Sequence, residues 1–133
     1  MESSGAAELE KLEVLYDEWA RGDYSRSAIF DPEVERDSFG MGERISASGL
    51  EEFIAAMGRW LSAWDRPLTL EADELIGSGD RILALVRWRG RGKGSGIEVE
   101  AGGAHIWTFR GGLVIRLEVY RDRDEARAAL EAG

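Results

Sequence analysis

The sequence contains no cysteine, and it has one histidine and two prolines in 133 residues. The absence of thiols excludes disulfides, thiolate zinc sites and cysteine nucleophiles, and it fits a reducing compartment, which we expect to be the cytoplasm. One histidine leaves any metal site to carboxylates, and we expect neither a metal nor an organic cofactor. No stretch approaches 18 apolar residues, so we expect no transmembrane helix and no membrane association.

Positive charge is also scarce. The chain has 17 Lys and Arg against 26 Asp and Glu, a formal net charge of −9. Because nucleic-acid binding depends on clustered Lys and Arg, this balance excludes a phosphate-tracking surface. A chain of this length buries roughly two thirds of the surface that its unfolded form exposes. It has no internal repeat and no Pro-rich linker, so we expect one domain over residues 1–133.

The first half of the chain has helical periodicity. Residues 4–21 form a predicted amphipathic helix, and its apolar stripe consists of Leu9, Leu12, Tyr16 and Trp19. Residues 24–31 are expected to form short turns that end before Pro32, and residues 33–39 an extended segment. A second helix is expected from Ser48 to about Trp64, opened by a capping box in Ser48-Gly49-Leu50-Glu51.

From residue 67 onward, apolar and polar residues alternate with a period of two, which indicates strands. Glycine-rich turns at residues 77–80, 90–96 and 110–112 divide this region into four antiparallel strands. A final helix is expected over residues 122–132, with Asp122 as its N-cap. Helices followed by a strand meander predict an α+β fold. We expect a cone in which a curved antiparallel sheet of four main strands wraps around the N-terminal helices and encloses a pocket.

Four segments resemble a known superfamily in order and spacing. They are residues 15–23 (LYDEWARGD), 30–34 (FDPEV), 49–53 (GLEEF) and 105–112 (HIWTFRGG), the last followed by residues 114–120. Together they resemble the nuclear transport factor 2-like superfamily, in particular its SnoaL-like branch, which is related to ketosteroid isomerases and polyketide cyclases. The resemblance covers nearly the whole chain. It implies the cone fold, but it selects no single activity.

The resemblance implies roles for three residues. Asp37 lies at the offset where ketosteroid isomerases have their carboxylate base, with Phe39 as apolar wall, although a solvated surface aspartate is the alternative. His105 alternates with Trp107 and Phe109 and is expected to face the cavity, where it would donate to an enolate or exchange protons with Asp37. Its alternative is a structural core histidine. Tyr16 lies one residue from the tyrosine donor of the isomerases, so it is either a second donor or a core residue.

The five tryptophans suggest an aromatic wall. Trp19 is assigned to the core. The other candidates for contact with a flat hydrophobic ligand are Phe39, Met57, Trp60, Trp64, Trp88, Trp107 and Val119. For each of them, core packing is the alternative.

The epoxide hydrolases related to this fold need an Asp-Arg-Asp constellation, and the matching strand reads Arg87-Trp88-Arg89. The second aspartate is missing, so we do not expect that activity. We expect Arg87 and Arg89 on the convex sheet face, paired with Arg116 and Glu118 across strands. Relatives often form homodimers through this face, and we expect the same here.

Two functions therefore remain open at this stage. The first is a cofactor-independent isomerase, cyclase or lyase that moves a proton on a hydrophobic carbonyl compound, with Asp37 as base and His105 and Tyr16 as donors. The second is a non-catalytic domain that binds a small hydrophobic molecule or serves only in dimerisation. An open cavity shared by Asp37 and His105 would favour the enzyme.

Overall fold

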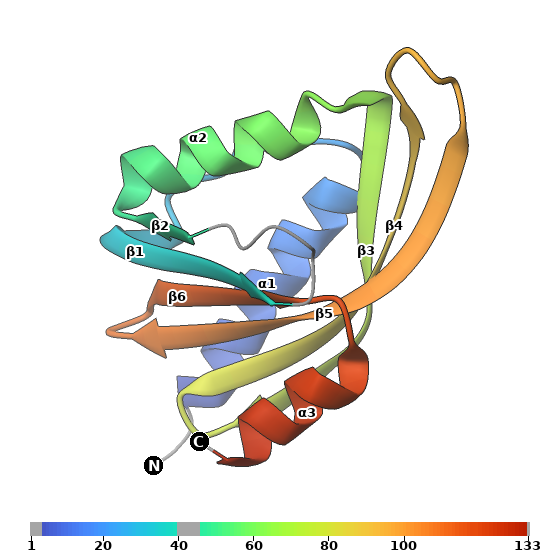
Figure 1. Ribbon diagram of the computed structural model, residues 1–133. Helices are drawn as coiled ribbons and strands as arrows, with labels where there is room; N and C mark the ends of the chain where they lie inside the picture. Colours follow the sequence, from blue (N-terminus) through green and yellow to red (C-terminus); the bar gives the residue numbers. More distant parts are fainter. Residues whose placement is uncertain (1–3, 40–45, 133) are drawn as a thin grey trace.

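The computed structural model describes residues 4–39 and 46–132 (Figure 1). Three helices and six strands lie in this part of the chain. In chain order they are α1 (Ser4–Ala20), β1 (Phe30–Phe39), β2 (Ser46–Ser48), α2 (Leu50–Leu61), β3 (Trp64–Ser78), β4 (Arg81–Gly92), β5 (Glu98–Arg110), β6 (Leu113–Tyr120) and α3 (Arg123–Ala132). No helix within these residues is both long and apolar enough to cross a membrane.

All six strands belong to one sheet with the order β2-β1-β6-β5-β4-β3. The four predicted antiparallel strands are β3 to β6, and each pairs with the next. The extended segment expected at residues 33–39 is part of β1, but neither β1 nor β2 was expected as a strand of the sheet. β1 runs parallel to β6, and β2 pairs with β1 in the antiparallel direction. The parallel pair joins segments about 80 residues apart, which no local pattern reveals.

The helices lie on both faces of this curved sheet (Figure 1). On the concave face, α1 contributes Leu12 and Trp19, and α2 contributes Phe53, to the larger cluster of buried side chains. On the convex face, Ala126 of α3 packs with Leu83 and other residues of a smaller cluster. The predicted α+β cone is confirmed, with the N-terminal helices on the concave side and α3 on the outside.

Two element boundaries differ from the prediction. Residues 24–29 are irregular and β1 already begins at Phe30, so Pro32 lies inside a strand, at an irregularity in the pairing with β6. Helix α2 ends at Leu61 and Trp64 opens β3. The helical spacing of apolar residues continues to Trp64, which is why the helix was expected to end there. Trp64 pairs with Gly92 of β4 in the sheet, and this pairing satisfies its backbone hydrogen-bonding groups.

The ends of the later helices differ in how they are capped. The predicted capping box at α2 is wrong in detail, because Gly49 is the N-cap and no side chain caps it. Glu52, rather than Glu51, accepts a hydrogen bond from the Ser48 amide. The prediction for α3 is confirmed, since the Asp122 carboxylate accepts from the amides of the second and third residues after it.

Arginine and carboxylate side chains pair on the convex face. Arg87 bonds Asp73 on β3, and Arg89 bonds Glu100 on β5. The expected pairing of these arginines with Arg116 and Glu118 is wrong, because Arg87 and Arg89 lie on β4, and β5 separates β4 from β6. Arg116 and Glu118 belong to β6, and Arg116 lies near Glu35, Asp37 and Glu118.

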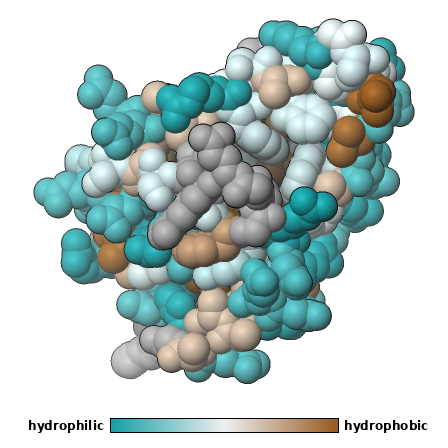
Figure 2. Space-filling view, in the orientation of Figure 1, coloured by the Kyte–Doolittle hydropathy of each residue, from teal (hydrophilic) through white to brown (hydrophobic). Residues whose placement is uncertain are grey.

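The described surface is mostly hydrophilic. Figure 2 shows teal side chains over most of one face of the molecule, with apolar ones in small separate patches. Among the described residues, only three large apolar side chains are exposed, namely Val14, Ile54 and Ile97. The apolar residues that could contact a hydrophobic ligand are therefore concentrated inside the cone.

Candidate functional site

Three polar side chains are joined by hydrogen bonds in the core of the cone. Tyr16 on α1 places its hydroxyl 2.6 Å from Nδ1 of His105 on β5. Nε1 of Trp107, two residues further along β5, donates to the same hydroxyl over 2.8 Å. All three side chains are buried, and the His105 and Tyr16 rings lie nearly parallel, with a 13° interplanar angle. The structure thus brings together two of the three predicted catalytic residues.

The direction of these bonds determines the tautomer of His105. An indole nitrogen can only donate, so the Tyr16 oxygen accepts from Trp107. A phenol oxygen can accept two hydrogen bonds, but Nδ1 of His105 is the one acceptor that the described residues place beside the hydroxyl hydrogen, so we assign that hydrogen to Nδ1 and the imidazole hydrogen to Nε2. Burial, and secondarily the positive charge of Arg36, lowers the pKa of His105 to about 3, so the ring is neutral at pH 7. Burial also raises the pKa of Tyr16 well above its ordinary value.

His105 lies in a row of buried residues that each keep a small exposed fraction. This row crosses three strands, with Ser38 of β1 facing Val119 of β6 and Val119 facing His105. Ser38, Val119 and His105 remain 3%, 7% and 6% exposed, whereas the adjacent Trp107 and Ala84 are completely buried. Among the described residues, Nε2 of His105 has no hydrogen-bond partner.

Aromatic side chains flank this row on the concave face. Met57 and Trp60 of α2 and Trp88 of β4 are only partly buried where they pack against the core. The Trp60 and Trp88 rings meet edge to face at 6.1 Å. Trp88 lies over Gly103, which shares a face of β5 with His105 two residues away. The contact of these three side chains with a flat ligand stays a prediction.

The remaining tryptophans have other environments. Trp107 is fully buried and holds Tyr16, so it supports the site from behind instead of lining it. Trp19 is in the core as expected, 2% exposed. Its indole nitrogen and that of Trp88 are both buried without a hydrogen-bond partner among the described residues. Trp64 lies further along the same concave face, beside Gly90.

Asp37 and Phe39 do not join this site. Along β1 they face the convex side, and Phe39 stacks on Tyr120 in the cluster beneath α3, with ring centroids 4.9 Å apart. Asp37 accepts a hydrogen bond from Ser46 and lies 3.8 Å from Arg116. The expected contact between Asp37 and His105 is therefore not formed. Ser38 lies in the same row as His105 and shares its face of the sheet. Asp37 is the neighbour of Ser38 along β1, so its side chain points to the opposite face.

Arg36, which the sequence analysis overlooked, lies on the concave face in place of Asp37. It is paired with Leu117, whose side chain belongs to the concave core. The guanidinium is partly buried, and its positive charge is close enough to His105 to lower the pKa of the His105 ring. Burial lowers the pKa of Arg36 itself, and the Asp37 charge opposes this effect. The alternation of Val34, Arg36 and Ser38 is the signal that could have identified it, had the core face of β1 been known.

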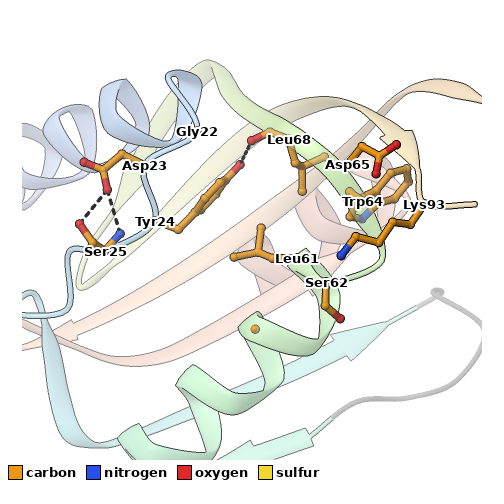
Figure 3. A pocket seen from close by; sticks show the side chains of 11 residues that line it. Gly22, Asp23, Tyr24, Ser25, Leu61, Ser62, Trp64, Asp65, Leu68 and Lys93 are labelled. Carbon is orange, nitrogen blue, oxygen red and sulfur yellow. Dashed lines mark hydrogen bonds between the residues drawn. The ribbon is translucent and has the colours of Figure 1, made fainter. Parts of the chain in front are cut away.

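A separate pocket of about 770 Å³ opens at one end of the concave face (Figure 3). It is formed by the segment after α1, the end of α2 and the start of β3. Tyr24, Leu61 and Leu68 are central, and Tyr24 donates to the Leu68 carbonyl over 2.7 Å. Trp64 and Lys93 lie at one side (Figure 3). His105 does not line this pocket, so the pocket and the buried row are distinct features.

In the described part of the chain, no group of three or more His, Asp or Glu side chains is arranged to hold a metal ion. Seven described carboxylates of the sheet instead form ion pairs with arginines on the convex face. They are Glu35, Asp37, Glu71, Asp73, Glu98, Glu100 and Glu118.

Solved structures with the same fold support the architecture. A putative SnoaL-like polyketide cyclase from Jannaschia sp. CCS1 superposes with a TM-score of 0.79 at 18% identity, covering 100% of this chain and 97% of that one. A putative polyketide cyclase from Xanthomonas campestris pv. campestris gives 0.70 at 18%, covering 96% and 99%. TerC, co-crystallised with polyporic acid, gives 0.69 at 19%, covering 94% and 98%. At these identities the likeness shows the fold alone.

Two sequence comparisons complement these structural ones. A search of curated proteins finds no match to this chain. The family model of the SnoaL-like domain, however, matches residues 12–117, most of the chain. This span includes the part of α1 that carries Tyr16, the whole of β5 with His105, and every strand of the sheet except the end of β6. The chain belongs to the SnoaL-like domain family.

Proposed function

We propose that this protein binds a small, planar, largely apolar molecule on the concave face of its sheet, and that His105 donates a hydrogen bond to a carbonyl oxygen of that molecule. The observation that carries the proposal is the chain of hydrogen bonds from Trp107 through Tyr16 to His105. It fixes a neutral imidazole with its Nε2 hydrogen unused among the described residues. A neutral, preorganised imidazole is a good donor to a carbonyl or to a developing enolate.

The surroundings of His105 suit such a ligand. Met57, Trp60 and Trp88 supply partly buried apolar and aromatic surface beside it. Small-molecule sites combine surface of this kind with a few polar groups that fix the orientation of the ligand. TerC, a protein with this fold, has been crystallised with polyporic acid, and putative polyketide cyclases share the fold. These similarities support a small-molecule ligand without specifying which one.

Catalysis of proton transfer is the second candidate, and it needs a base. Asp37 was the expected base, but it lies on the convex face beside Arg116. Isomerase, cyclase or lyase chemistry needs both a base and a hydrogen-bond donor that polarises the carbonyl. Of these two groups, the site contains the donor. The proposal therefore covers binding and polarisation, and it assigns no base among the described residues. A domain that serves only in dimerisation would leave the unused Nε2 hydrogen without a role.

A matched pair of probes tests the proposal. 2-Acetonaphthone carries a carbonyl, whereas 2-ethylnaphthalene has a similar shape without it, and both can be titrated by quenching of tryptophan fluorescence. One net hydrogen bond is worth about 1 kcal/mol, so we expect the ketone to bind about fivefold more tightly. His105→Leu should abolish this preference and Asp37→Asn should preserve it. Equal binding of both probes to the wild type would contradict the role of His105, and binding of neither would contradict the site.

The same ketone tests catalysis. Its methyl hydrogens exchange with deuterium only through enolisation, which NMR follows directly. We expect binding without marked acceleration of exchange, because Asp37 does not reach the concave face. Fast exchange that disappears in Asp37→Asn would reinstate the proton-transfer hypothesis with Asp37 as base.

A further inference from the structure

The polar groups on the concave face are almost all hydrogen-bond donors. Nδ1 of His105 is occupied by Tyr16, which leaves the Nε2 hydrogen as the free group of that ring. Trp88 has a buried indole N–H with no partner among the described residues. Arg36 adds five N–H donors in a planar, permanently charged group. A ligand that satisfies these groups must be rich in acceptors.

Arg36 differs from the sheet arginines that pair with carboxylates. Arg87, Arg89, Arg91 and Arg116 each have recorded ion pairs on the convex face. Within residues 4–39 and 46–132, no carboxylate forms an ion pair with Arg36. Burial of the guanidinium is offset only by the charge of the neighbouring Asp37, without an ion pair, so a bound anion would lower the remaining cost.

The register of the sheet brings Arg36 and His105 toward the same place. Arg36 faces Leu117 on β6, and Leu117 faces Trp107 on β5, which places Arg36 one row from His105 on the same face. One strand, β6, lies between Arg36 and His105, so the long arginine side chain has to extend across it to reach the same ligand group as His105. The electrostatic effect of Arg36 on His105 agrees with this placement.

We propose that the ligand of the concave face carries an ionised acidic oxygen group, and that Arg36 and the Nε2 hydrogen of His105 bind this group together. This inference rests on the proposed function and adds the charge of the ligand to it. The apolar body of the ligand lies against Trp60 and Trp88, and its anionic end points toward β1. A guanidinium binds planar oxyanions such as carboxylates with two parallel hydrogen bonds, which neither lysine nor histidine can match.

The net charge of the protein makes this preference easy to distinguish from unspecific attraction. At −9, the molecule as a whole repels anions. Preference for an acid over its neutral ester must therefore come from a local positive group. 2-Naphthoate and methyl 2-naphthoate form such a pair, with the same ring system and a charge on only one of them.

The experiment is a titration of both probes against the wild type and two variants by isothermal calorimetry at pH 7. We expect the wild type to bind 2-naphthoate at least tenfold more tightly than the ester. Arg36→Met should lose at least tenfold for the acid and change the ester less than twofold, while Arg36→Lys should retain part of the preference. Arg116→Met, which removes an arginine from the convex face, is the matched control and should behave as the wild type.

The outcomes separate the two proposals. Equal binding of acid and ester by the wild type overturns the anion site while leaving the hydrophobic site in place. An unchanged affinity of Arg36→Met for the acid also overturns it. If neither naphthoate probe nor 2-acetonaphthone binds, the proposed function and this inference both fail. The comparison on the wild type needs no substitution, so it holds even if a variant folds poorly.

Discussion

The Tyr16 hydroxyl lies 2.6 Å from Nδ1 of His105, although 89 residues separate the two in the chain. This contact joins α1 to the middle of the sheet and makes one ring nitrogen an acceptor. The other nitrogen then carries the hydrogen and is the group offered to a ligand. The contact therefore links the packing of the N-terminal helix to the chemistry of the concave face.

Loss of the Tyr16 hydroxyl should affect both stability and tautomer. Tyr16→Phe leaves the Trp107 N–H without its acceptor and Nδ1 of His105 without its donor. We expect the free energy of unfolding in urea to fall by about 1–3 kcal/mol, the cost of unsatisfied buried polar groups. In ¹⁵N NMR spectra, the single histidine of the wild type should show the Nε2–H tautomer. A wild-type spectrum with the hydrogen on Nδ1 would contradict the proposed direction of the bonds.

Burial of a neutral His105 predicts a loss of stability in mild acid. The pKa of this ring is about 3 in the folded protein, below the ordinary value of 6.5 that applies after unfolding. Between these values the unfolded state binds more protons, so stability is complete above pH 6.5 and falls as the pH drops toward 3. From pH 7 to pH 5 the loss due to His105 is about 2 kcal/mol.

The His105→Asn variant provides the reference for this measurement, because its side chain does not titrate in the same range. Carboxylate effects are common to both proteins and cancel in the difference. Denaturant unfolding at pH 7, 6 and 5 should therefore show a steeper decline for the wild type. Parallel declines would mean that the ring is protonated in the folded state.

Gly103 should tolerate no side chain. A Cβ at this position would lie 2.6 Å from the Tyr120 carbonyl oxygen, which is backbone and cannot move aside without disturbing β6. We expect Gly103→Ala to lower the free energy of unfolding by about 1–3 kcal/mol, the usual cost of overpacking. Gly77→Ala, where nothing lies within 4 Å of the added atom, should change it by less than about 0.5 kcal/mol. Equal effects in the two variants would contradict the close approach of β5 and β6.

The homodimer expected through the convex face remains a prediction. Light scattering should give twice the 14.7 kDa of one chain. Arg89→Glu replaces the exposed ion pair with Glu100 by two like charges on this face, and it should shift the protein toward the monomer. Arg21→Glu makes the same change of charge at the end of α1 and should not. A wild-type monomer at all concentrations would contradict the prediction.

Local periodicity was sufficient to predict several residues of the site. The helical stripe identified Tyr16 as an inward residue, and the period of two along β5 placed His105, Trp107 and Phe109 on one face. Both predictions are confirmed by the packing of these residues on the concave side. They succeeded because each element buries one continuous apolar stripe, and the stripe alone specifies the inward face.

The resemblance, rather than periodicity, misplaced Asp37. This residue was assigned from its offset relative to the base of the ketosteroid isomerases, with Phe39 beside it as apolar wall. The Phe39 ring is instead buried against Tyr120 on the convex side, where α3 creates a second apolar cluster. A sheet with helices on both faces has two apolar interiors, so a hydrophobic residue no longer indicates which face is concave.

Composition and periodicity thus determined the fold class, the absence of thiol chemistry and the inward residues of α1 and β5, because these depend on neighbours close in sequence. The partner of β1, the side of the sheet on which α3 packs, and hence the exchange of Asp37 for Arg36 on the concave face were decided only by the tertiary structure. Each depends on contacts between segments far apart in the chain, whose pairing leaves no local pattern.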